Sequence, residues 1–150
     1  MKYIILFSLS LFMSVAYAQQ STDSDILRRA EVMPVFQECQ EERFTNSPYP
    51  CTLFHLGNHF KNAITTENPS GQVTKCVLYL VVEADGSVSN VSLVRGVVVN
   101  AADTQTKTAL EQSLNARILE EAQQLTFQSP GYQNGQKARV ALQFSANVSY

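Results

Sequence analysis

The strongest pattern in the chain is an alternation of apolar and polar side chains close to its end. Between residues 139 and 148 every second side chain belongs to one apolar set: Val140, Leu142, Phe144, Ala146 and Val148. The positions between them hold Arg139, Ala141, Gln143, Ser145 and Asn147. Successive side chains of a strand point to opposite faces of a sheet. The pattern therefore predicts a closing strand with one face in the core and the other in water.

Two other stretches repeat apolar side chains at helical spacing. The first begins at Thr52, and the second runs from Asp103 to about Leu125. In each, the apolar positions recur at intervals of three and four residues, which places them on one side of a helix. They are Leu53, Leu56, Phe60 and Ile64 in the first, and Leu110, Leu114, Ile118, Ala122 and Leu125 in the second.

Between these helices lies a run of β-branched and apolar residues from Val73 to Glu83, which predicts a strand. Asp85-Gly86 then predicts a hairpin through a primed turn, and the segment that contains Val91 returns antiparallel. A second turn is expected at Asn134-Gly135. The order of elements predicts an α+β domain, with a small antiparallel sheet of about three strands and two helices packed on one face.

The first strand is apolar on both faces. If Cys76, Leu78, Leu80 and Val82 face the helices, then Val77, Tyr79 and Val81 face the other way. We expect residues 19–50, whose periodicity is weak, to form an extended N-terminal arm before a domain at 51–150. Two interpretations stay open: the arm covers the second face through Val35 and Phe36, or a partner does.

The first residues have the features of an export signal. Lys2 precedes an apolar run from Tyr3 to Tyr17, and the run ends in the small-x-small pattern Ala16-Tyr17-Ala18. The run is shorter than the roughly 20 apolar residues that span a bilayer. We expect residues 1–18 to be a signal peptide cleaved near Ala18, which would leave a periplasmic or secreted chain without a membrane anchor.

Export would place the three cysteines where disulfides persist. Cys39 and Cys51 flank a polar, proline-containing stretch that can close as a loop, whereas Cys76 lies within the predicted strand. We expect a disulfide between Cys39 and Cys51. Cys76 is expected to be a small buried side chain, since burial in apolar surroundings keeps a thiol unreactive.

Composition narrows the function classes. The chain has 150 residues, 16% of them charged, and its formal net charge is −2. A length of this order is typical of one domain. The slight acidity removes the basic footprint of a nucleic-acid binder, so we expect no nucleic-acid partner.

Candidate chemistry is sparse. His55 and His59 stand four residues apart on the first predicted helix, with Cys51 four residues earlier. Cys51 and His59 would lie about 12 Å apart along the axis, which is too far for both to bind one zinc ion. We expect a solvated pair of histidines, no metal site and no cofactor. Because no nucleophile and base are brought together by any motif, we expect that the protein is not an enzyme.

Taken together, the motifs resemble the C-terminal domain of TonB energy transducers. The resemblance covers about residues 53–148, and Phe127 stands where the family has tryptophan. The segments that carry it are Gly71-Gln72-Val73, Glu83-Ala84-Asp85-Gly86-Ser87-Val88, Asn90-Val91-Ser92-Leu93-Val94, Phe127-Gln128-Ser129-Pro130-Gly131 and Asn134-Gly135-Gln136-Lys137. The cysteine pair before the helix also resembles a subgroup of that family. The uncleaved anchor and proline-rich spacer of full transducers are not found here, so the resemblance implies a fold and a peptide-binding mode rather than energy transduction.

The resemblance implies a partner that docks by β-strand addition, such as an extended peptide or a segment of an outer-membrane transporter. The candidate edge is the closing strand, at Arg139, Val140, Ala141, Leu142, Gln143, Phe144 and Ser145. Two alternatives remain. One is a structural protein that forms a homodimer through the face with Val77, Tyr79 and Val81, and the other is a metal-dependent enzyme that uses His55 and His59.

Overall fold

The computed structural model describes residues 25–39, 48–64 and 71–150. The predicted signal peptide, its cleavage point at Ala18 and most of the loop between the paired cysteines lie outside the described residues. The elements follow in the order β1 (Ile26–Leu27), β2 (Val35–Phe36), η2 (Gln37–Cys39), α1 (Pro48–Ala63), β3 (Val73–Val82), β4 (Val88–Arg95), α2 (Thr104–Gln123), β5 (Phe127–Ser129), β6 (Gly131–Gln133) and β7 (Gln136–Ser149).

The main sheet is built on the pair of long strands β3 and β7. They run antiparallel in unbroken register from Val73 opposite Ser149 to Val82 opposite Val140. The strand order is β1-β7-β3-β4, and β6 also pairs with β7. The prediction of an antiparallel sheet of about three strands is therefore too small. Among the described residues the sheet has five strands, β1 is parallel to β7, and β2 and β5 form a second sheet. Strands of two or three residues are too short to show a periodic pattern.

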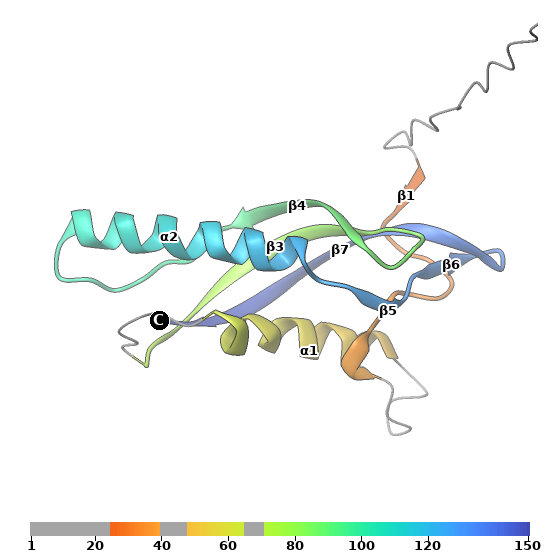
Figure 1. The fold of residues 1–150 in the computed structure, drawn as a ribbon, viewed down its shortest axis with the longest axis horizontal. Helices are drawn as coiled ribbons and strands as arrows, with labels where there is room; N and C mark the ends of the chain where they lie inside the picture. The colour runs from red at the N-terminus through yellow and green to blue at the C-terminus, as the bar shows by residue number, and fades with distance from the viewer. Residues whose placement is uncertain (1–24, 40–47, 65–70) are drawn as a thin grey trace, which may run out of the picture.

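Both helices cover one face of the main sheet, as the sequence predicts, and the fold is α+β. In Figure 1, α1 runs along β7 and α2 runs along β4. Side chains of one parity from β3 and β7 meet the apolar sides of the two helices in a single core. Fully buried members of this core include Phe60, Leu78, Ile118 and Leu142.

The start of α2 agrees with the sequence, whereas α1 begins earlier than predicted. Asp103 caps α2, and its carboxylate accepts a hydrogen bond from the Thr106 amide at 2.8 Å. Helix α1 begins four residues before the predicted Thr52, at Pro48, a residue type that suits the first helical position. None of the helices in the described part of the chain is both long and apolar enough to cross a membrane.

The two glycine turns differ. Asn134 and Gly135 both have positive φ, as a primed two-residue turn requires. In the loop between β3 and β4 only Gly86 has positive φ, and the Gly86 amide donates to the Glu83 carbonyl. The predicted primed turn is wrong there: the connection is a three-residue loop, Ala84 to Gly86, whose last residue takes the left-handed conformation.

Candidate binding edge

The outer side of β7 is occupied at its beginning. β6 pairs with Gln136–Ala138, and β1 pairs in parallel with Arg139 and Val140. From Ala141 onward, β3 is the only strand that pairs with β7 within the described residues. Of the predicted docking edge, Arg139–Ser145, the first two residues are therefore not open, because Arg139 and Val140 pair with β1 on their outer side.

Two backbone hydrogen bonds show which residues of β7 face outward. The Tyr150 amide donates to the Gln72 carbonyl across the β3–β7 ladder, and the Glu83 amide donates to Ser87 on the β4 side. In an antiparallel ladder, alternate residues exchange hydrogen bonds with one neighbour, and the residues between them direct their groups to the other side. Because the register is unbroken, the odd-numbered residues Ala141, Gln143 and Ser145 direct their N–H and C=O groups away from β3.

Helix α1 limits the edge at its far end. A Cβ atom on Gly57 would lie 3.1 Å from the carbonyl oxygen of Ser145, so the helix backbone comes close to this part of β7. Two residues later, the Asn147 side chain donates to Asn58 Oδ1 at 3.3 Å. The stretch that is left between β1 and the crossing helix is therefore Ala141–Gln143.

A cavity of about 390 Å³ lies at this stretch. It is lined by Arg28, Tyr49, Tyr79, Ala141, Leu142 and Gln143. Tyr49 belongs to the first turn of α1, Tyr79 belongs to β3, and Arg28 directly follows β1. Two neighbouring cavities, of about 310 and 410 Å³, also include Arg28. Leu142 and Phe144 from the predicted set belong to the core and hold the register of β7, and Leu142 also borders the cavity.

Arg28 and Tyr49, which line this cavity, were not among the predicted site residues. Both lie in the weakly periodic segment before residue 51, where no pattern indicates a face. Their role depends on β1 and α1 arriving at the same part of β7, and that arrangement leaves no signal in the spacing of residues.

The face opposite the helices is less open than expected. Val81 is fully buried, whereas Val77 and Tyr79 are half-buried. Of the two interpretations left open, the one in which the arm covers this face through Val35 and Phe36 is wrong. β2 pairs with β5, and Phe36 belongs to the core on the helix side, where its ring contacts His59 and Phe127.

Arg139 is committed to an ion pair on the helix-free face. Its Nε and Nη2 atoms donate to the Glu83 carboxylate at 2.7 and 2.9 Å, and Ser89 Oγ donates to the same carboxylate. The hydrogen bond from Arg139 is the main cause that lowers the pKa of Glu83. The Arg139 side chain is therefore engaged within the chain, and it is not available to a partner as the sequence suggests.

The two histidines of α1 contact different parts of the chain. His59 Nε2 lies 2.8 Å from Glu121 Oε1 of α2, and its ring packs edge-on against Phe36 and Phe60. The expectation that His59 lies on a solvated face is wrong, because α2 supplies an acidic neighbour 62 residues away in the sequence. His55 instead lies near the paired cysteines.

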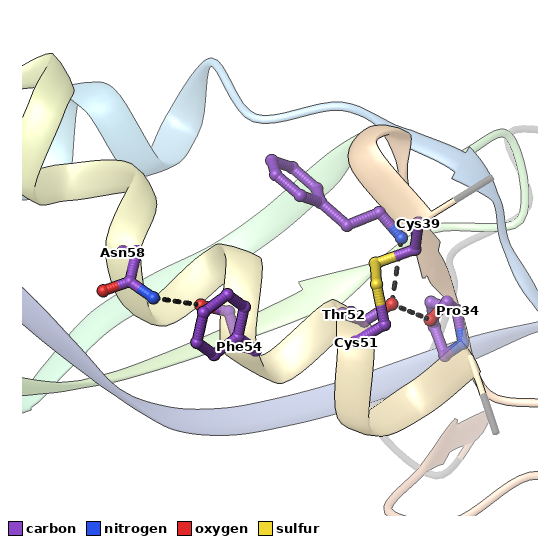
Figure 2. The surroundings of a disulfide bond; sticks show 7 residues. Pro34, Cys39, Cys51, Thr52, Phe54 and Asn58 are labelled. Atoms are coloured by element: carbon purple, nitrogen blue, oxygen red, sulfur yellow. Dashed lines mark hydrogen bonds between the residues drawn. A yellow bond between two sulfur atoms is a disulfide. The ribbon is translucent and has the colours of Figure 1, made fainter. Parts of the chain in front are cut away.

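The predicted disulfide between Cys39 and Cys51 is confirmed, and it ties η2 to the first turns of α1 (Figure 2). Beside it, the hydroxyl of the buried Thr52 accepts a hydrogen bond from the Phe36 amide at 3.1 Å and donates to the Pro34 carbonyl at 3.3 Å. Cys76 is free and buried, as predicted. These contacts fix the end of the N-terminal segment against α1.

Comparisons of this chain with protein families, with curated proteins and with solved structures gave no match.

Proposed function

We propose that this domain binds an extended segment of a protein partner, which adds to the sheet as a short strand beside Ala141–Gln143. The observation that supports the proposal is the gap that the described residues leave on the outer side of β7, between the end of β1 and the crossing of α1. Ala141 and Gln143 direct backbone donors and acceptors into this gap. An extended peptide satisfies such groups by β-strand addition.

The cavity at Ala141–Gln143, called the groove below, supplies side-chain contacts for such a segment. Tyr49 and Tyr79 line it from a helix and from the sheet, and tyrosine combines an apolar ring with a polar tip. Arg28 adds a positive charge where β1 ends. We expect the partner segment to place a carboxylate near Arg28 and an apolar side chain between the tyrosines.

The short length of the edge sets the strength of binding. Two outward residues offer up to four backbone hydrogen bonds, each worth about 0.5–1.5 kcal/mol. Backbone pairing alone therefore gives weak binding, and the side chains in the groove carry the selectivity.

The other edge of the sheet, β4, is a poorer template. Its pairing with β3 shifts register twice, and Asn90 has a φ of 49°. Irregularities of this kind twist an edge away from regular pairing, and natural sheets use them to avoid added strands. β7, in contrast, keeps its register along its whole pairing with β3.

The resemblance to TonB C-terminal domains favours the same mode of binding, with a segment of an outer-membrane transporter as the partner. Together with the predicted export signal, it supports a role in the periplasm. The disulfide is compatible with an oxidising compartment.

The test uses peptides selected from a displayed library of linear sequences against the folded chain. We expect Gln143→Pro to weaken binding of the selected peptides at least tenfold in fluorescence anisotropy, because proline removes an outward N–H group. Gln143→Ala keeps the N–H group and serves as the matched control, with a change of less than about threefold. Circular dichroism checks that both variants keep the native fold.

Hydrogen exchange gives a second measurement. Peptide binding should slow exchange of the Ala141 and Gln143 amides more than that of amides on β4. Peptides that bind a natively folded Gln143→Pro variant as tightly as the unmodified chain would contradict the proposal.

A further inference from the structure

Three potential metal ligands meet at the start of α1. One donor atom each of Cys39, Cys51 and His55 lies within 4.8 Å of the other two. Cys51 and His55 are four residues apart on α1, so they share one side of the helix. Cys39 reaches them from η2. Two sulfurs and one imidazole nitrogen form a donor set that Zn²⁺ binds in proteins.

We propose that reduction of the Cys39–Cys51 disulfide converts this cluster into a binding site for one Zn²⁺ ion. A dithiol reductant transfers two electrons and two protons: its own thiols become a disulfide, and Cys39 and Cys51 become thiols. Zn²⁺ then replaces the two thiol protons, which pass to solvent, and His55 binds as the neutral imidazole. Water completes the fourth position. This proposal does not depend on the proposed peptide-binding edge.

The geometry asks for little movement. The two sulfurs are about 2.0 Å apart in a disulfide, and they would be about 3.8 Å apart in a tetrahedral site with Zn–S bonds near 2.3 Å. The metal would then keep η2 tied to the helix, as the disulfide does.

The surroundings favour a buried metal site over a reactive thiol pair. The exposed fractions of Cys39 and Cys51 are 6% and 2%. Thr52, the residue after Cys51, is hydrogen-bonded to the Phe36 amide and the Pro34 carbonyl. These bonds hold the segment before η2 against α1 independently of the disulfide. The ligands thus stay close to one another after reduction, and a preorganised set binds a metal more tightly than a mobile one.

The experiment is an anaerobic titration of the reduced chain, freed of reductant, with Co²⁺ as a spectroscopic substitute for Zn²⁺. We expect one equivalent to give the absorption of thiolate-bound tetrahedral cobalt, which Zn²⁺ then removes. The oxidised chain should give no such absorption. His55→Ala should lower the affinity at least tenfold, and His59→Gln, four residues further along the same helix, should leave it within about threefold.

Each outcome decides the proposal. If the reduced chain loses its native circular dichroism, recovery with one equivalent of Zn²⁺ supports the site, and failure to recover overturns it. Absence of thiolate–cobalt absorption in a folded reduced chain overturns it as well. An equal affinity in His55→Ala and the unmodified chain would remove His55 from the site and contradict the proposed ligand set.

Discussion

Glu83 and Arg139 face each other across the last residues of the β3–β7 pair, on the side of the sheet away from the helices. Two parallel hydrogen bonds join them, from Nε to Oε2 at 2.7 Å and from Nη2 to Oε1 at 2.9 Å. The two side chains are 24% and 16% exposed. This bidentate contact joins the two strands near the fully buried Val81, where β1 also pairs with β7. It fixes the beginning of the proposed binding edge.

The first prediction concerns this ion pair. Glu83→Gln should lower the free energy of unfolding by about 1–2 kcal/mol at pH 7, because it removes a charge-assisted pair that is only partly screened by solvent. Since Arg139 lowers the pKa of Glu83 below 4.5, the folded chain binds this proton less readily than the unfolded chain. The contribution is fully present above pH 4.5 and is lost as the pH falls through the lowered pKa. Urea denaturation at pH 7 and at pH 3 measures both effects.

The control for this prediction is Glu120→Gln, on the exposed side of α2. It should change the free energy of unfolding by less than about 0.5 kcal/mol at either pH. A Glu83→Gln variant that loses as much stability at pH 3 as at pH 7 would show that packing, and not charge, is responsible.

The second prediction concerns the disulfide. Its cysteines are 12 residues apart, so the loop-entropy model gives about 3 kcal/mol of stabilisation. The double variant Cys39→Ala/Cys51→Ala should lose about this free energy in urea denaturation at pH 7. Added reductant should destabilise the unmodified chain by a similar amount without affecting the double variant. A reductant effect on both proteins would place the cause elsewhere.

The third prediction concerns the free thiol. Burial raises the pKa of Cys76, and its Sγ lies 3.9 Å from the Ala146 carbonyl within the β3–β7 pair. The thiolate is the reactive form, so iodoacetamide should label Cys76 slowly in the native oxidised chain at pH 8 and rapidly in urea. Mass spectrometry of the labelled chain reads both rates. Rapid labelling under native conditions would show that β3 opens away from β7.

The long elements could be predicted from sequence, and the short ones could not. The alternation around Leu142 and the helical repeat around Ile118 each extend over ten or more residues, so one face of each element is defined by its own spacing. The pair Ile26–Leu27 has no such repeat, and its place beside β7 depends on contacts more than a hundred residues away in the sequence. The open stretch of β7 was therefore predicted too long at its beginning.

For the candidate site too, features with a local sequence pattern could be predicted and the others could not. The sequence identified the disulfide because Cys76 lies in a strand pattern and so leaves Cys39 and Cys51 to pair. It did not indicate Glu121 beside His59, because the two residues lie on different helices and are 62 positions apart in the sequence. Side chains from separate elements define the groove at Ala141–Gln143, so no local motif marks it.

The last prediction compares two glycines in turns. Gly86 and Gly135 both have positive φ, at 87° and 71°, so alanine at either position strains the backbone by about 1–2 kcal/mol. The surroundings differ: a Cβ atom on Gly86 would lie 2.6 Å from the Phe127 carbonyl oxygen, whereas one on Gly135 would meet nothing within 4 Å. The Phe127 amide also donates a hydrogen bond to the Gly86 carbonyl, so the β3–β4 loop is held directly against β5. Gly86→Ala should therefore lose at least about 1 kcal/mol more than Gly135→Ala in urea denaturation, because the backbone must shift in addition to the strain. Equal losses would show that the loop moves away from β5 at no cost, and that the contact with Phe127 does not hold the hairpin in place.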